Sequence, residues 1–425
     1  MDRSSIARPR FLERRGPALQ RLVLTGGAQT AMQVLAFATG LVVIRVLPVD
    51  EYAFYTLAMA ALGTMTVLSD CGISQAVLSS GGRVWRDPDA LGGVVSGGLR
   101  LRMLFASGAG TLCSIVLIVL LTRRGATFAQ ATLVTAGAIP LLLATTTSQL
   151  YEVVPRLQQN ILPLQHIQLA SAGIRLITVA AVTMLWPVAW VVGLAAGITQ
   201  LWTSWRVRHL ALTAAHPGHP CPPEAWAEML RMLRRTAPSA VYYAFAGQVS
   251  VWLISVFGNT ERVAQVGALT RLAMLFNILS TVFALMVVPR FARMQAGQAL
   301  LFRWFWVVQL VLILPLIAVV AVVARFPSES LAILGGDYRV LSTEVVLVAA
   351  SGAMTLLSGC AYSLAAARGV VAAPAFVIVT AITLQVGLAL TLPISTVAGV
   401  LWLQLISNIV FWFLHAVNFS RTVLR

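Results

Sequence analysis

Two arginines lie inside stretches that are apolar enough to cross a membrane. Arg271 is about eight residues into the stretch 263–288, or roughly 12 Å deep at 1.5 Å per helical residue. Arg175 is near the middle of the stretch 164–186. Burying an arginine at such a depth costs from about 3 to above 10 kcal/mol, depending on the scale, so these residues usually face a wet cavity or a partner. We therefore expect both to line a cavity, where a guanidinium group can hold an anionic group in bidentate fashion.

Structural roles would also explain these arginines. Arg271 could pair with Glu261, or it could reach the membrane headgroups by snorkelling. Arg175 could pair with Glu152, which follows the fourth apolar stretch. The sequence alone leaves cavity lining and ion pairing as alternatives for each residue.

Four amide side chains are further candidates for a cavity. Gln29 and Gln33 are four residues apart, so they share one face of the first predicted helix. Gln248 and Asn277 lie in later apolar stretches. All four could bind a substrate rich in hydroxyl groups, and hydrogen bonding between helices is an equally good account of them.

Three charged residues stand at the ends of predicted spans. Arg45 ends the first span close to Asp50 and Glu51, so pairing with either of them, or snorkelling, competes with substrate contact. Asp70 and Glu152 end the second and fourth spans. Each could carry a coupling ion or proton, and pairing with a nearby arginine is the structural alternative.

The composition indicates a polytopic membrane protein. Apolar residues make up 59% of the chain and charged residues 10%, whereas soluble domains have roughly 25% charged residues. The formal net charge is +16, with no lysine. The arginines are scattered between apolar stretches and form no continuous patch, so we expect no binding to nucleic acid.

No motif for enzyme chemistry or a cofactor is found. The sequence has no glycine-rich phosphate loop, no HExxH and no GxSxG, so we do not expect an enzyme. The four cysteines have no CxxC spacing, which argues against a disulfide framework. The segment that holds His216, His219 and Cys221 is rich in proline, and we interpret it as a linker without a metal.

The apolar stretches predict an all-α protein of about twelve transmembrane helices. With the N-terminus inside, 22 of the 30 arginines fall on inner segments and five on outer ones. This bias supports an N-in, C-in topology, because inner loops collect basic residues. The predicted spans are 28–46, 52–68, 104–121, 131–149, 164–186, 188–205, 237–257, 263–288, 304–323, 345–366, 372–392 and 397–417.

The spans divide into two sets of six around a central cavity. We expect a basic cytoplasmic segment at 1–21 that is not a cleaved signal peptide, bundles at 22–205 and 237–418, a cytoplasmic linker at 206–236 and a tail at 419–425. The outer corner at 46–51 aligns with 256–261, as two parallel repeats would give; the substrate site of such transporters lies between the halves near mid-membrane. Residues 224–233 predict a short helix on the inner membrane surface.

The first predicted hairpin carries a family resemblance. A first helix with Gly and Gln precedes IRVL at 44–47, DEY at 50–52 and LSDCGI at 68–73. This pattern resembles the start of Wzx-type polysaccharide flippases, of the multidrug/oligosaccharidyl-lipid/polysaccharide exporter superfamily. The context of Arg271, VGALTRL at 266–272, is similar to a segment in which this family commonly has a basic residue.

The resemblance implies a multi-pass flippase in the bacterial inner membrane. Its substrate would be an undecaprenyl-pyrophosphate-linked oligosaccharide for surface polysaccharide, and its partners would be membrane lipids and other polysaccharide-assembly proteins. Three other functions stay open. One is a non-transporting scaffold, which nothing in the sequence rules out. A drug/cation antiporter of the same fold would need buried carboxylates, and a membrane glycan polymerase or ligase would need a larger outer loop than this chain has.

Overall fold

The computed structural model describes residues 15–294, 297–370 and 373–424, and in these ranges it contains helices and no strand. Most of the predicted basic segment 1–21 is outside the described residues. The helices are α1 (Arg15–Val46), α2 (Val49–Asp70), α3 (Ile73–Val84), α4 (Pro88–Arg123), α5 (Phe128–Tyr151), α6 (Val153–Leu157), α7 (Ile161–Leu185), α8 (Ala189–Leu212), α9 (Pro223–Ala246), α10 (Val249–Phe257), α11 (Thr260–Ala273), α12 (Leu275–Met286), α13 (Val288–Ala292), α14 (Gln298–Arg325), α15 (Pro327–Ala332), the 3-10 helix η1 (Gly336–Tyr338), α16 (Ser342–Ala366), α17 (Pro374–Thr391) and α18 (Val397–Leu424).

The predicted all-α membrane fold is confirmed. Ten of the described helical segments are long and apolar enough to span a membrane, and the pair α9–α10, bent by 56°, makes an eleventh. The 24-residue helix α8 lies along α5 and accounts for the twelfth predicted span.

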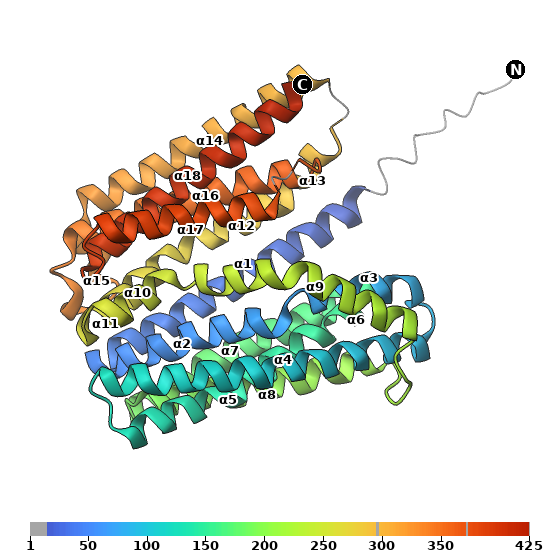
Figure 1. Cartoon of the computed structure of the whole chain (residues 1–425), viewed down its shortest axis with the longest axis horizontal. Helices are drawn as coiled ribbons and strands as arrows, with labels where there is room; N and C mark the ends of the chain where they lie inside the picture. Colours follow the sequence, from blue (N-terminus) through green and yellow to red (C-terminus); the bar gives the residue numbers. More distant parts are fainter. Residues whose placement is uncertain (1–14, 295–296, 371–372, 425) are drawn as a thin grey trace, which may run out of the picture.

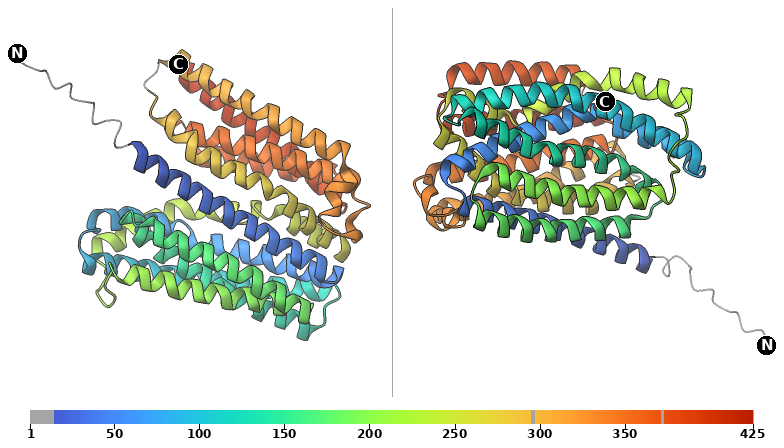
Figure 2. Two further views of the ribbon diagram at one scale, coloured as in Figure 1. Left: turned by 180° about the vertical axis from the view of Figure 1, so that it is seen from behind. Right: turned by 90° about the horizontal axis from the view of Figure 1, so that it is seen from below.

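The helices form two groups, which Figure 1 shows one above the other. The lower, N-terminal group contains α2 to α8, and the upper, C-terminal group includes α14, α16, α17 and α18. Helix α1 lies between the groups and contacts α7 on one side and α12 on the other (Figure 2). We call the end of the molecule with the α1–α2 turn the hairpin end, and the end where α1 begins and α18 finishes the basic end.

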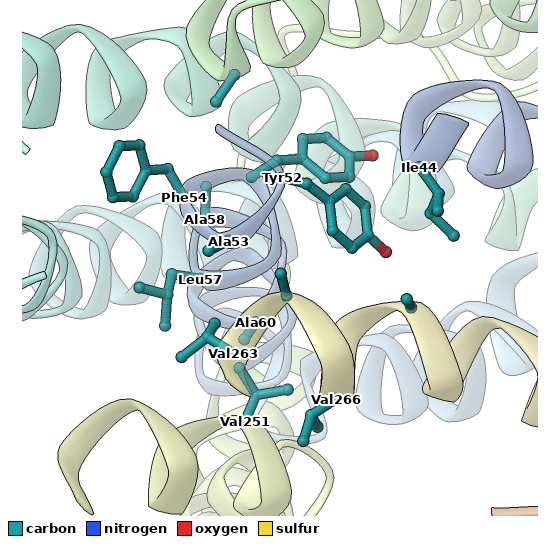
Figure 3. Packing of buried hydrophobic residues seen from close by; sticks show 14 of the residues in the cluster. Ile44, Tyr52, Ala53, Phe54, Leu57, Ala58, Ala60, Val251, Val263 and Val266 are labelled. Atoms are coloured by element: carbon teal, nitrogen blue, oxygen red, sulfur yellow. The ribbon is translucent and has the colours of Figure 1, made fainter. Parts of the chain in front are cut away.

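The buried core shows where the two groups are joined. Towards the hairpin end, one hydrophobic cluster draws on both groups, for example on Leu57 and Ala61 of α2 and on Val263 and Leu269 of α11. Figure 3 shows part of this cluster, with Val263 of α11 beside α2. Towards the basic end, each group has a separate core. The groups are therefore joined at the hairpin end and separate at the basic end.

The first hairpin follows from local sequence. Pro48 precedes α2, and Asp50 and Glu51 occupy its first turn, where negative charge is favoured by the helix dipole. Cys71 and Gly72 end α2 in the left-handed region, with φ of 40° and 86°. A Cβ on Gly72 would also lie 2.5 Å from Oγ1 of Thr236, so this turn requires glycine.

Several helices begin before their predicted spans, α4 and α9 among them. Helix α4 begins at Pro88 instead of residue 104, because the side chain of Asp87 caps its first turn. Helix α9 begins at Pro223 and runs on into the seventh span, so the predicted separate surface helix at 224–233 is wrong. Its apolar residues Met229 and Leu233 are buried in the core beside α3 instead of in lipid.

Gly193 and Gly197 of α8 are four residues apart and pack against α5, as this spacing predicts. A Cβ on Gly197 would lie 3.0 Å from Cβ of Pro140, and a Cβ on Gly193 would lie 3.6 Å from the backbone of Gly137. These small residues allow α5 and α8 to form the most extensive helix pair in the structure.

We expect Gly267→Ala to destabilise the joint between the two groups. A Cβ at this position would lie 2.4 Å from Oγ1 of Thr56 on α2, and overpacking of this kind costs about 1–3 kcal/mol. Gly387→Ala on α17 is the control, because a Cβ there meets nothing within 4 Å. Thermal unfolding in detergent should show a lower Tm for the first variant only, and equal Tm values would contradict this account.

Candidate functional site

A cavity of about 550 Å³ lies between the two groups of helices. Its walls come from α1, α2 and α7, with one residue each from α5 and α8, on one side and from α10, α11, α12, α16 and α18 on the other. No aspartate or glutamate is among its lining residues. Four of the predicted site residues line it: Arg175, Gln248, Arg271 and Asn277.

Arg271 enters the cavity from the break between α11 and α12, at Met274. Its side chain lies across α1, where a Cβ on Gly40 would be 3.3 Å from Cδ of Arg271. Tyr52 and Tyr55 of α2 lie near its guanidinium group, and its Nη1 lies 3.7 Å from Sδ of Met274. Arg271 thus has neutral polar neighbours and a partly exposed surface in the cavity.

Arg175 faces the same cavity from α7 in the other group. Its Nη2 donates to Oε1 of Gln200, and Nε2 of Gln200 donates to Oγ of Ser148 at 3.3 Å. Nε of Arg175 is buried and has no acceptor among the described residues. Tyr55 lines the same cavity and lies near both Arg175 and Arg271.

The predicted ion-pair alternatives for these arginines are wrong. Glu261 accepts a hydrogen bond from Gln265 at 3.0 Å and forms no salt bridge with Arg271. Glu152 pairs with Arg156 at 2.5 Å and not with Arg175. The cavity therefore holds two positive charges without a carboxylate beside them.

The two cavity amides have free hydrogen-bonding groups. Gln248 follows the bend between α9 and α10 and approaches Gly63, where a Cβ would lie 2.8 Å from Nε2 of Gln248. Asn277 lies on α12, within two turns of Arg271. Within the described part of the chain, neither side chain makes a hydrogen bond to the protein.

Gln29 and Gln33 do not line the cavity itself. They lie on α1, on the same helical face as the lining residues Ala36 and Gly40 and nearer to the basic end. They make no side-chain hydrogen bond within the described ranges. This face of α1 therefore continues from the cavity towards the basic end as a polar stripe.

Arg45 is outside the cavity and joins the two groups at the hairpin end. Its Nε donates to the carbonyl oxygen of Ile333 at 3.1 Å, and its Nη2 donates to that of Ala332 at 3.3 Å. The predicted pairing with Asp50 or Glu51 is not formed. Glu51 instead accepts from the backbone N–H of Ala189 at 2.8 Å and so caps α8.

Asp70 and Glu152 line a second hollow, of about 570 Å³, at the basic end of the N-terminal group. Asp70 lies 3.4 Å from Nη1 of Arg102, and its Oδ1 accepts from the Ser74 hydroxyl. Nη2 of Arg102 donates to Oε1 of Gln149 at 2.5 Å. Both predicted carboxylates are thus paired with arginines here, and neither reaches the central cavity.

Arg102, Tyr52 and Tyr55 are not among the site residues predicted from the sequence. Arg102 was assigned to an inner loop, but it is fully buried within α4. Its proximity to the apolar run from residue 104 could have indicated burial. The tyrosines could have been found from their spacing, since residues three apart share a helix face.

The central linker is tied to α4 by its histidines. His216 Nδ1 and His219 Nε2 lie 2.8 and 3.3 Å from Oδ1 of Asp89. Across the described ranges, no group of three or more His, Cys, Asp or Glu side chains could hold a metal ion.

Comparisons with known proteins show similarity in structure only. No family model matches the chain, and no curated protein sequence does. The lipid II flippase MurJ in its inward closed conformation superposes with a TM-score of 0.75 at 9% identity, covering 95% of this chain and 88% of that one. The chain therefore has the same fold as this flippase.

Two MATE transporters give similar results. An inward-facing MATE family transporter of the MOP superfamily has a TM-score of 0.68 at 13% identity, covering 92% of this chain and 95% of that one. A mutant of the Vibrio cholerae MATE transporter VcmN has a TM-score of 0.59 at 13% identity, covering 96% and 97%. The fold is thus found both in a lipid flippase and in a multidrug resistance transporter. The side chains of the cavity must distinguish these functions.

We expect Asp70→Asn to destabilise the protein by about 3–5 kcal/mol, because it removes the carboxylate that is paired directly with the fully buried Arg102. Glu228→Gln is the control. The partner of Glu228, Arg83, has a side chain that is 71% exposed, so this loss should cost under about 1 kcal/mol. Unfolding in detergent measures the loss of stability in both variants. Similar losses would show that the Asp70–Arg102 pair contributes no more to stability than the exposed pair.

Proposed function

We propose that this protein is a flippase for an undecaprenyl-pyrophosphate-linked oligosaccharide in the bacterial inner membrane, acting in surface polysaccharide biosynthesis. The observation that carries the proposal is the pair Arg175 and Arg271. They come from different groups of helices and face one cavity that has no carboxylate in its lining.

The chemistry of the cavity suits a pyrophosphate. Each guanidinium group can donate two parallel hydrogen bonds to phosphate oxygens, and the low dielectric of a membrane interior strengthens the attraction. Two unneutralised arginines are costly in the empty protein, and an anionic headgroup would offset that cost. The buried, unpartnered Nε of Arg175 supplies one donor for such a ligand.

An antiporter for cationic drugs fits this cavity less well. Binding a cation or a proton inside the membrane requires a carboxylate, and the carboxylates Asp70 and Glu152 are instead paired with arginines in the separate hollow. We assign these two residues to ion pairing. A polymerase or ligase would need catalytic groups on a large loop at the hairpin end, and the sequence offers none.

We propose that transport occurs by alternating access of the bundles 22–205 and 237–418, with the basic end in the cytoplasm. The groups have separate cores at that end, which corresponds to an inward-facing state. At the hairpin end, the Arg124 guanidinium donates to the carbonyl oxygens of Ser255 and Gly258, and Arg45 reaches α15. Opening to the outside must break these bonds.

We expect the double variant Arg175→Ala, Arg271→Ala to reduce flipping at least about 100-fold. Each charged hydrogen-bonding partner contributes about 1.5–3 kcal/mol, and 1.4 kcal/mol corresponds to a factor of ten. The measurements are surface polysaccharide in a strain that depends on the variant and flipping of the lipid-linked glycan in proteoliposomes. Arg123→Ala is the control, because Arg123 is exposed at the hairpin end; normal export by the double variant would refute the assigned role.

We expect Arg124→Ala to increase opening at the hairpin end. It removes the guanidinium bonds to α10 that cross between the groups. In a background without the four native cysteines, Ala60→Cys places a thiol in the cavity wall. An impermeant maleimide added from outside should label it several-fold faster in the Arg124 variant than in an Arg123→Ala control, and equal rates would show that this bond does not hold the end closed.

A further inference from the structure

A side pocket of about 460 Å³ opens off the central cavity in the C-terminal group of helices. It lies between the bend of α9–α10 and the helices α16, α17 and α18. Its wall is shared with the cavity at six residues: Gly247, Gln248, Val251, Thr270, Thr355 and Gln404. A single ligand could therefore occupy the cavity and the side pocket together.

The side pocket differs from the cavity in charge. None of its lining residues is Arg, Lys, Asp or Glu. Its polar groups are amides, hydroxyls and the imidazole of His415, and two aromatic rings, Tyr242 and Tyr243, meet edge to face with centroids 5.1 Å apart. The amides that line it are Gln248, Gln385, Gln404 and Asn408.

The hydrogen bonds of the pocket leave both donors and acceptors free. Oε1 of Gln404 accepts from Ser250 at 3.2 Å, which leaves its amide N–H groups. Nδ2 of Asn408 donates to Oγ1 of Thr355 at 2.7 Å, which leaves its carbonyl oxygen. The Ser407 hydroxyl is 5% exposed and has no partner among the described residues.

A sugar is the ligand that matches free donors beside free acceptors, because its hydroxyl groups can act as both. A hydroxyl group donates one hydrogen bond and accepts two. A phosphate would find no cation in this pocket, and an apolar drug would leave the buried Ser407 hydroxyl and the amides unpaired, which is costly. Tyrosine rings add apolar faces with polar edges, which suit the mixed surface of a sugar ring.

We infer that this side pocket binds the sugar residues of the glycan while Arg175 and Arg271 hold its pyrophosphate. The inference rests on the proposed function and adds a separate subsite to it. A site built to hydrogen-bond hydroxyl groups rejects analogues that lack them far more strongly than an apolar site does. The side pocket, and not the arginine pair, thus selects which glycan is moved.

Two probes test the subsite in the full chain reconstituted in lipid nanodiscs. One is sugar-free undecaprenyl pyrophosphate, and the other is the lipid-linked oligosaccharide extracted from the native cells. Asn408→Leu and Ser407→Ala lie in the side pocket and not in the cavity lining. Each should weaken binding of the oligosaccharide lipid about 10- to 100-fold and leave the sugar-free lipid within about twofold.

Asn418→Leu is the matched control, because Asn418 is on the same helix, α18, and outside the pocket; it should change neither affinity. Retained binding of the sugar-free lipid shows that a variant is folded. The subsite would be overturned if the ratio of the two affinities were unchanged in both pocket variants, or if Ser407→Ala lost binding of both probes equally. The arginine pair would keep its role in either case. A wild-type chain that binds neither probe would overturn the proposed function and the subsite with it.

Discussion

A guanidinium group is unstable among hydrocarbon chains unless it has a partner, and the structure of this protein depends on that constraint. The cost of several kcal/mol or more per buried charge must be met by a partner, by water or by a ligand. The chain meets it in two ways. Arg102 is fully buried and has a carboxylate, a hydroxyl and an amide around it. Arg175 and Arg271 have only neutral neighbours, so their charge remains available to an anion.

The position of the core explains why those two arginines can meet. Near the hairpin end the groups share one hydrophobic cluster, and towards the basic end each has its own. The cavity forms where the shared core ends. Small residues allow this arrangement, since Gly40 leaves room for the side chain of Arg271, and Gly267 lets α11 approach Thr56 on α2. Bonds from Arg45 and Arg124 to backbone carbonyls complete the closed end without adding a carboxylate.

Division of the site into a charged part and a neutral part has a physical rationale. Strong electrostatic attraction recognises phosphate regardless of what is attached to it, whereas oriented amide and hydroxyl groups discriminate between arrangements of hydroxyls. The two parts share a wall at the bend between α9 and α10, where Gln248 faces both. Broken helices are common at the substrate sites of transporters because they place polar groups at mid-membrane. The same fold can thus host different cargo through the side chains at this junction.

The sequence by itself determined the all-helical membrane fold, the number of spans and the first hairpin, because apolar runs of about 20 residues have few alternatives in a bilayer. It also marked Arg175 and Arg271, since charge inside an apolar run is conspicuous. Only the tertiary structure decided that these two face one cavity, that Arg45 lies outside it and that Arg102 belongs to a buried ion pair. Those outcomes depend on how helices distant in sequence rotate and pack against each other. Hydropathy along one helix does not specify the neighbour that each face will meet.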